Sequence, residues 1–571
     1  MKSENSVATP PAISREPTKL VKNEALKASS NYLRGGLLDG LEDATTGALS
    51  RDDTLLSKFH GIYQQDDRDI RKELRRQKQE PAYSFMIRVR APGGICSTDQ
   101  WLKMDRIAAS YANPSLKLTT RQAIQFHGVI KTNLKASIQK INHALMDTLA
   151  ACGDVNRNVM CSPNPHDANI HAEILQTTRA ISERLTPKTK AYHDIWLTDH
   201  SGENIKVTRD EAEPIYGKTY LPRKFKIVIA IPPSNDVDVY AHDLGFIAIV
   251  KDGVLRGYNV TVGGGMAMSH GNEKTYPRLA RLIGFCQPDQ IVEVAEAIVT
   301  VQRDHGDRSN RKHARLKYTI DDYGIVWFRD ETESRLGYRL DPIQAFTFEN
   351  SQDRYGWVEG ENGHRHLTLF IQNGRVRDDE ESSLRTALRE IARIHKGEFR
   401  LTPNQNLIIA NVRDRDRKSI ESILEHHRVV AAHNRSALRL NSMSCVALPT
   451  CSLALAESER VIPELITELE RILAIHELEK DDITLRITGC PNGCARPHLA
   501  EIGIVGRAPG KYNLYLGGGF RGDRLGTLFQ ESLTLKEITD QLIPILGTYK
   551  KERQSNERFG DFCLRTKIVA A

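Results

Sequence analysis

The sequence has none of the segments that would carry a protein into or across a membrane. Its first residues, MKSENSVATPPAISREP, contain no apolar core of the kind that a secretory signal requires. No stretch approaches the ~18–20 consecutive apolar residues that are needed to span a bilayer. We therefore expect a cytoplasmic protein that does not associate with membranes and whose cysteines stay reduced.

An excess of one charge and nucleotide-binding loops are also missing. The 80 Lys and Arg residues face 73 Asp and Glu residues, and this net charge of +7 is too small for 571 residues to indicate a nucleic-acid partner. Gly263–Gly265 and Gly517–Gly519 fit neither the dinucleotide fingerprint nor the phosphate-binding loop. We interpret them as strand ends where backbones approach closely, and we expect any nicotinamide or flavin chemistry to reside on another polypeptide.

The length predicts roughly three or four domains. Residues 1–80 are polar, with a charged run QQDDRDIRKELRRQKQE at 64–80, and predict an extended arm that is either a solvated tail or a partner-docking segment. The alternating stretch SFMIRVRAP from Ser84 predicts a strand. A helix is expected around 101–111 and another strand over 118–130.

Three matched segments indicate an internal duplication. A strand, a helix, the pattern Leu-Thr-x-x-Gln and a further strand occur up to residue 130 and again over 367–412. Each copy is followed by an Asn-rich cysteine segment, NRNVMCSPNP at 156–165 and NSMSCVALPTC at 441–451. RGYNVTVGGG at 256–265 then matches GKYNLYLGGG at 510–519. The common order predicts a pseudo-twofold protein with a cleft shared by the two copies.

Four of the nine cysteines form two pairs. Cys445 and Cys451 flank five residues, Cys490 and Cys494 flank three, and the segment between the pairs has the apolar spacing of an amphipathic helix. Pro449 and the Pro-Asn-Gly turn at 491–493 place both pairs in loops. Four thiolates in loops fit a four-iron cluster or a structural zinc. The five-residue gap disfavours zinc without excluding it, and unrelated core cysteines remain an alternative.

The pattern Cys-x5-Cys followed by Thr-Gly-Cys-Pro-Asn-Gly-Cys resembles the signature of the sulfite and nitrite reductase family. The resemblance implies that Cys445, Cys451, Cys490 and Cys494 hold one [4Fe-4S] cluster. It also implies that Cys494 is the axial ligand of a siroheme iron. The implied reaction is the six-electron reduction of sulfite to sulfide, in sulfur assimilation and cysteine biosynthesis.

Two cation pairs lie close together in the sequence. Arg88 and Arg90 share one face of the expected strand, and Lys224 and Lys226 share one face of another. Buried cations of this kind require an anion, although exposed faces of edge strands would explain them equally well. The resemblance implies that the sulfite-binding and proton-delivering residues are Arg88, Arg157, Lys224 and Lys226.

The stretch LTTRQAIQFHG resembles the siroheme-contacting segment of the family. The residues whose contact with the cofactor is implied are Lys117, Thr119, Arg121, Gln125, His127 and Asn492. A structurally satisfied core histidine is the alternative for His127.

The resemblance implies an α+β fold with duplicated ferredoxin-like halves and two α/β cofactor-binding domains. The expected divisions are an arm at 1–80, the first half at 81–150, a siroheme and substrate domain at 151–348, the second half at 349–428 and an iron–sulfur and siroheme domain at 429–571.

The segments SNYLRG (30–35) and FHGIYQQDDRDIR (59–71) resemble the NADPH-dependent branch of the family. That branch implies a partner flavoprotein that carries FAD and FMN and oxidises NADPH. The alternatives are a ferredoxin-dependent sulfite or nitrite reductase and, from another class, a non-catalytic electron carrier or a zinc-stabilised binding protein.

Overall fold

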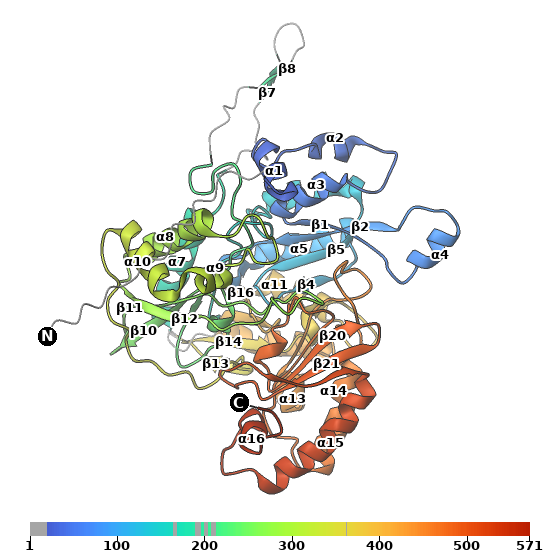
Figure 1. Cartoon of the computed structure of the whole chain (residues 1–571). Helices are drawn as coiled ribbons and strands as arrows, with labels where there is room; N and C mark the ends of the chain where they lie inside the picture. Colours follow the sequence, from blue (N-terminus) through green and yellow to red (C-terminus); the bar gives the residue numbers. More distant parts are fainter. Residues whose placement is uncertain are drawn as a thin grey trace, which may run out of the picture.

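The computed structural model describes residues 20–163, 168–188, 196–198, 204–206, 213–360 and 363–570. Pro10, Pro11 and Pro17 of the expected arm lie outside these residues. Within the described part, no helix is long and apolar enough to cross a bilayer. Four five-stranded sheets carry the helices, and a two-stranded ribbon of β7 (Trp196–Thr198) and β8 (Asn204–Lys206) projects from them (Figure 1).

Two of the sheets form the ferredoxin-like halves. The first has the order β1 (Ile62–Asp66), β2 (Tyr83–Val89), β5 (Ile124–Val129), β4 (Leu116–Leu118) and β15 (Arg375–Val376). The second has the order β13 (Gly356–Glu359), β14 (His364–Leu369), β17 (Leu407–Arg413), β16 (Glu398–Leu401) and β3 (Ile95–Ser97). Strand β15 of the second half forms an edge of the first sheet, and β3 of the first half forms an edge of the second sheet. The two halves therefore interlock.

A common hydrophobic core joins these halves. Its helices are α5 (Thr98–Tyr111), α6 (Leu134–His143), α11 (Leu384–Ile394) and α12 (Arg417–His426). The expected helix around 101–111 is confirmed by α5, which begins at a capping box of Ser97 and Gln100. Trp101 of α5 meets Phe399 of the other half with ring centroids 4.9 Å apart, so burial of apolar surface holds the two halves together.

The expected single strand over 118–130 is wrong. The chain ends β4 at Leu118, turns, and starts β5 at Ile124. The Thr119 hydroxyl accepts hydrogen bonds from the N–H groups of Arg121 and Ala123, and Gln122 adopts a φ of 49°. Side-chain closure of a turn competes with strand pairing. The second Leu-Thr-x-x-Gln pattern turns in the same way between β16 and β17, with Gln405 at a φ of 70°.

The other two sheets share one topology, which confirms the predicted duplication. In the third sheet, β6 (Met160–Cys161), β9 (Ile227–Ala230) and β10 (Leu244–Lys251) are parallel, while β11 (Val254–Val262) and β12 (Arg281–Cys286) follow antiparallel. In the fourth, β18 (Ser442–Ser444), β19 (Leu485–Thr488) and β20 (Ile502–Ala508) are parallel, and β21 (Lys511–Leu516) and β22 (Thr527–Leu533) antiparallel.

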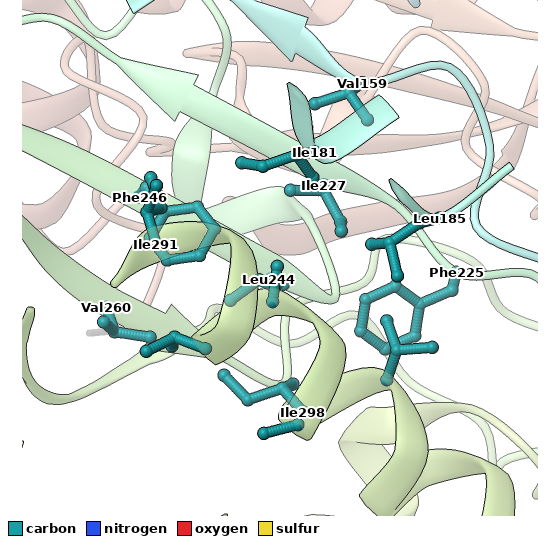
Figure 2. Close-up of a cluster of buried hydrophobic side chains, with 14 of the residues drawn as sticks. Val159, Ile181, Leu185, Phe225, Ile227, Leu244, Phe246, Val260, Ile291 and Ile298 are labelled. Carbon is teal, nitrogen blue, oxygen red and sulfur yellow. The ribbon is translucent and has the colours of Figure 1, made fainter. Parts of the chain in front are cut away.

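Helices cover these two sheets. The third sheet carries α7 (Ala168–Arg184), α8 (Ile291–His305), α9 (Leu316–Tyr323) and α10 (Ile325–Leu336). Figure 2 shows Ile291 and Ile298 of α8 in one buried cluster with Leu244, Phe246 and Val260 of the sheet. The fourth carries α13 (Ala437–Leu440), α14 (Ile462–Ile475), α15 (Leu535–Glu552) and α16 (Phe559–Arg565). The predicted amphipathic helix between the cysteine pairs is confirmed by α14, whose apolar positions are buried.

The glycine runs end β11 and β21, as expected. A Cβ on Gly264 would lie 2.2 Å from the Tyr240 carbonyl oxygen, and one on Gly518 would lie 2.1 Å from that of Ala500. Both contacts are shorter than any side chain tolerates, so close backbone approach explains these glycines.

The expectation of an extended arm is wrong for the described residues before 81. They form α1 (Lys22–Ser29), α2 (Leu37–Glu42), α3 (Arg51–Leu56), β1 and α4 (Arg71–Arg76). Leu33, Leu56 and Phe59 are buried in the core of the third sheet's unit, and β1 pairs with β2. A few apolar residues spaced along a polar segment were enough to dock it on neighbouring units.

Candidate functional site

A cavity of about 350 Å³, including the part that is open to solvent, lies where the third and fourth units meet. The first ferredoxin-like half contributes Thr120 and Arg121 from the turn before β5. The segment before β9 contributes Lys224 and Lys226, and the loop after β19 contributes residues 492–496. The predicted cleft between the two copies is therefore present.

The cavity contains two half-buried lysines without counterions among the described residues. No hydrogen bond or ion pair holds the ammonium group of Lys224 or Lys226 within the part of the chain that the structure describes. Burial, reinforced by neighbouring cations, lowers the pKa of both groups well below their usual value. These lysines flank the bridge that Phe225 makes with Asn156, so they project to one side of the segment, as predicted. A site built this way favours an anion.

Arg121 adds a third cation. Its Nη2 donates to the Asn158 carbonyl oxygen at 2.6 Å, and its buried Nε has no hydrogen-bond partner among the described residues. Burial, with Arg157 and Arg88 nearby, lowers the Arg121 pKa to about 9. An unsatisfied buried donor beside the two lysines is a further sign that the cavity is shaped for an anionic ligand.

Two more arginines line the cavity, and sequence reasoning missed both. Arg315 forms an ion pair with Asp243 at 2.8 Å, and Arg496 forms one with Asp238 at 2.5 Å. Arg315 is distant in sequence from the other cavity residues, whereas Arg496 closely follows the second cysteine pair but belongs to no recognisable motif. Because each already has an acidic partner, these arginines shape the wall of the cavity, whereas the lysines remain available to a ligand.

Arg88 and Arg157 lie behind the lining residues. The Gln125 carbonyl oxygen accepts from Arg88 Nε at 2.8 Å, and the Gln125 nitrogen donates to His127 Nε2 at 3.2 Å. Arg88 Nη1 also lies 2.7 Å from the Cys152 sulfur. Arg157 donates to the Gly153 carbonyl oxygen, and its charge contributes to the lowered pKa of Lys224. Cys152 lies outside the two cysteine pairs, and no sequence pattern indicates this contact.

Arg90 does not share the surroundings of Arg88. Its guanidinium forms a two-pronged ion pair with Asp147, at 2.7 and 2.8 Å. It also donates to the Thr186 hydroxyl at 2.8 Å. The sequence pairing of the two arginines was therefore misleading, because Asp147 neutralises Arg90 locally.

Lys117 and Thr119 are not at the cavity. The Lys117 ammonium is fully buried and donates to Glu459 at 2.8 Å and to the Asn373 carbonyl oxygen. Burial opposes ionisation of Glu459, but Lys117 and Arg375 outweigh it and lower its pKa to about 2. Thr119 closes its own turn, as described above. Both residues support the scaffold beneath Arg121.

His127 is a buried neutral imidazole. Burial, strengthened by neighbouring cations, lowers its pKa well below 6.5. Its Nδ1 has no hydrogen-bond partner among the described residues. Contact with the Gln125 amide accounts for only one of the two ring nitrogens. The alternative of a core histidine whose hydrogen bonds are all made therefore holds for Nε2 but not for Nδ1.

The four paired cysteines converge from two loops. Cys445 and Cys451 follow β18, and Cys490 and Cys494 follow β19, at the carboxyl ends of neighbouring parallel strands. Burial, together with the nearby Cys494 thiol, raises the pKa of Cys445 and raises that of Cys490 to about 11. The fold thus brings two cysteine pairs that are separated in the sequence into one group of neighbouring sulfurs.

Polar hydrogens are directed at these sulfurs. The Gly489 N–H donates to the Cys445 sulfur at 3.3 Å, and the Asn492 amide nitrogen lies 3.5 Å from the Cys490 sulfur. Cys494 and Asn492 both line the cavity of the lysines. Donors of this kind offset the negative charge of metal-bound thiolates.

The donor set suits an iron–sulfur cluster. Four cysteine sulfurs come from two neighbouring loops, and polar hydrogens of Gly489 and Asn492 are directed at two of them. Cysteine thiolates with such donors are the usual surroundings of a [4Fe-4S] cluster.

Two family models match the chain. The nitrite/sulfite reductase ferredoxin-like half domain matches residues 76–144 and 358–427, which contain most strands of the two interlocked sheets. The nitrite and sulphite reductase 4Fe-4S domain matches residues 152–340, the unit of the third sheet. The four cysteines lie in the other unit, which has the same strand topology.

Curated relatives match almost the whole chain. Sulfite reductase [NADPH] hemoprotein beta-component of Staphylococcus saprophyticus is 57% identical, over 96% of each chain. The protein with that description in Oceanobacillus iheyensis is 55% identical, over 98% of this chain and 96% of its own. Among solved structures, the Mycobacterium tuberculosis NirA protein has a TM-score of 0.77 at 26% identity, over 96% of this chain and 97% of its own.

Proposed function

The chain belongs to the nitrite and sulfite reductase family, and from this premise we propose that it is the catalytic hemoprotein of an NADPH-dependent sulfite reductase. Its reaction is the six-electron reduction of sulfite to sulfide in sulfur assimilation. The observation that carries the proposal is the pair of half-buried lysines, without an ion-pair partner among the described residues, in a cavity that also contains Cys494. Anion-binding groups and the last cysteine of a cluster-binding group meet there.

The residues present fit both cofactors. Cys445, Cys451, Cys490 and Cys494 would hold the [4Fe-4S] cluster, and Cys494, on the cavity wall, would also reach the siroheme iron. When bound, the cluster supplies stored electrons and the siroheme iron supplies a centre that holds sulfur through successive reductions. Arg121, with its unsatisfied buried Nε, is placed to meet a carboxylate of the macrocycle.

The lysines couple anion binding to proton supply. Without an anion, burial favours their neutral amines. An anion in the cavity favours the charged form, so its binding draws protons onto Lys224 and Lys226. Each ammonium can then donate a proton as an oxygen leaves as water. Arg88 and Arg157, which lie behind the lining residues, add positive charge that favours an anion in the cavity.

The electrons come from a partner that oxidises NADPH. The chain contains neither a dinucleotide fingerprint nor a phosphate-binding loop, and the relatives are described as the beta-component of an NADPH enzyme. A flavoprotein carrying FAD and FMN can take hydride from NADPH and release single electrons to the cluster.

One spectrum combined with one assay tests the proposal. The purified holoprotein should show the visible bands of siroheme, shift them on titration with sulfite, and reduce sulfite with reduced methyl viologen as donor. Nitrite serves as the comparison substrate. A Lys251→Ala variant, altered at an exposed lysine in β10, is the control for Lys224→Ala.

Lys224→Ala should keep both cofactors and lose sulfite turnover, because the anion loses a buried partner. Colourless protein with bound zinc would refute the proposal. So would normal sulfite turnover by the Lys224→Ala variant.

A further inference from the structure

Lys224 and Lys226 belong to an irregular segment, residues 219–226, which precedes β9 and which we call the lysine segment. Two N–H groups of this segment donate to the carbonyl oxygens of Asp154 and Val155, at 2.9 and 3.0 Å. Regular strand pairing begins only after it, with β9. The position of the two lysines therefore depends on contacts outside the sheet.

Three successive carbonyl oxygens of the lysine segment accept hydrogen bonds from cationic side chains. Arg308 donates to those of Thr219 at 3.4 Å and Tyr220 at 2.7 Å. Lys27 of helix α1 donates to that of Leu221 at 2.8 Å. The segment is therefore held by side chains from the N-terminal helix and from the loop after α8, both of which are remote from it in the sequence.

Lys27 is a buried lysine with acidic partners. Its side chain is 1% exposed, and its ammonium lies 2.5 Å from Glu24 of the same helix and 3.7 Å from Asp154. Burial lowers the Lys27 pKa, while Asp154 and Glu24 oppose that change. Lysines are almost never fully buried unless they are paired. A specific polar contact, and not apolar packing alone, therefore anchors α1 at the lysine segment.

Lys27 is part of a network that we call the latch: Glu24, Lys27, Asp154, Arg308 and Arg311. Glu24 also pairs with Arg308 at 2.5 Å, and Asp154 accepts a two-pronged ion pair from Arg311 at 2.6 and 3.0 Å. Burial opposes ionisation of Asp154, but Arg311 and Lys27 outweigh it and lower its pKa to about 2. Two carboxylates thus connect three basic side chains from separate parts of the chain.

We propose that the latch, with Lys27 at its centre, positions Lys224 for sulfite binding by fixing the lysine segment. This inference rests on the function proposed above. Leu221, whose carbonyl oxygen Lys27 holds, lies three residues before Lys224, and Asp154 lies three residues before Arg157. Lys27 lies outside the cavity lining, so it acts through the segment and not on the anion. A displaced Lys224 ammonium would meet the anion at a longer distance and a poorer angle, which weakens a charge-assisted hydrogen bond.

The test combines two substitutions in the holoenzyme. Lys27→Met keeps an unbranched side chain and removes the ammonium. It is made in the unaltered chain and again in Lys224→Ala, and titration of the siroheme bands with sulfite gives the dissociation constant. Carbon monoxide, a neutral ligand of ferrous haem, is the second probe. Lys22→Met is the matched control, because Lys22 is an exposed lysine of the same helix that pairs with Asp52 at 3.2 Å.

Lys27→Met should raise the sulfite dissociation constant about 10-fold in the unaltered chain, as for one misplaced charge-assisted contact. In Lys224→Ala the same substitution should raise it less than about 3-fold, because the ammonium that it would displace is absent. Binding of carbon monoxide to the reduced enzyme should not change, since a neutral ligand needs no cation. Turnover driven by methyl viologen should fall with sulfite affinity in Lys27→Met, while Lys22→Met should behave as the unaltered enzyme.

Each failure has its own signature. Unchanged sulfite affinity in Lys27→Met would overturn the positioning role while leaving the proposed function intact. An equal loss of affinity with and without the Lys224 side chain, or a loss of carbon monoxide binding, would also overturn it, because the effect would then be a general loosening of the fold. If Lys27→Met does not retain siroheme, Arg308→Lys is the milder change in the latch, and the same outcomes decide. Unaltered holoprotein that cannot reduce sulfite with methyl viologen would instead refute the proposed function.

Discussion

Two cavities differ in charge: the first lies where the two copies of the repeat meet, and the second lies within the second copy. The first contains Arg121, Lys224 and Lys226 without counterions among the described residues. The second, of about 290 Å³ including its open part, is lined by Asp353, Tyr355, Asn404, Ser442, Thr484 and Arg486, among others. The topology matches Asn404 to Arg121 in the repeated turn, and Thr484, which precedes β19, to Lys226, which precedes β9. Two equivalent positions are thus cationic in the first cavity and neutral in the second.

This difference in charge affects the stability of the folded chain. Burying an unpaired cation is costly, and only the first cavity bears that cost. The arginine of the second cavity is neutralised, because Arg486 donates to Asp238 at 2.6 Å. Asp238 also holds Arg496 of the first cavity, so one carboxylate balances an arginine from each side. The cavity with Lys224 and Lys226 is therefore the candidate anion site, and the second cavity has no unpaired cation among its lining residues.

Removing the shared carboxylate should have the largest effect. Asp238→Asn leaves Arg486 and Arg496 buried without a counterion, and the unfolding free energy should fall by about 3–5 kcal/mol. Chemical denaturation measures this. The exposed pair of Asp561 and Arg524 provides the control, because Asp561→Asn should cost less than about 1 kcal/mol. Similar small losses in both variants would show that Asp238 does not link the cavities.

Exchanging the residue that precedes β9 tests the difference in charge between the two cavities directly. Lys226→Thr gives the first cavity the side chain of the second, and sulfite turnover should fall by about 100-fold because a proton donor is lost. The siroheme spectrum should not change. Thr484→Lys is the matched control, which should leave turnover intact and lower thermal stability. Turnover close to normal in Lys226→Thr would mean that the two cavities do not differ through this position.

The turn residue should have a smaller effect. Arg121→Asn copies Asn404 into the first cavity and removes the donor that we assign to a carboxylate of the macrocycle. We expect siroheme occupancy to fall by about 10-fold at limiting cofactor, as for one charge-assisted contact. Absorbance per mole of protein measures it. Asn404→Ala in the second cavity should leave siroheme occupancy unchanged. Equal losses of occupancy in the two variants would contradict the assignment.

The sequence predicted those features that depend on local pattern. Helix α14 follows from apolar periodicity, the duplication from repeated segments, and the shared side of Lys224 and Lys226 from their spacing. The lining role of Arg315 and Arg496, and the pairing of Lys117 with Glu459 across 342 residues, were not predictable. These contacts depend on how separate units pack against each other, and no short sequence pattern indicates that packing.

The turn at Thr119 and the packing of residues before 81 failed for a second reason. We expected one strand over 118–130, but the Thr119 hydroxyl accepts two backbone hydrogen bonds that close a turn there. In the N-terminal segment, charge dominated the composition and hid the few residues that dock it, such as Leu33 and Phe59. Average composition is a weak guide where single buried side chains decide the position of a segment.

The smallest expected effect concerns the pH dependence of stability, which should distinguish the cavities without any assay of activity. Burial lowers the Lys226 pKa in the folded chain below its usual 10.5. Between these two pKa values the unfolded chain binds more protons, so the unfolding free energy should rise with pH. The contribution is at most about 1.4 kcal/mol per pH unit. Below the folded-state pKa of Lys226 the full destabilisation by its charge persists, and above pH 10.5 this destabilisation vanishes.

Lys226→Met removes this group, so its unfolding free energy should rise less steeply with pH than that of the unaltered chain. Urea denaturation of the cofactor-free protein at a series of pH values measures both slopes. Thr484→Met at the equivalent position of the second cavity should leave the slope unchanged, because no titrating group is lost there. If Lys226→Met kept the original slope, Lys226 would be charged in the folded chain, and the first cavity would contain a counterion that its neutral counterpart lacks.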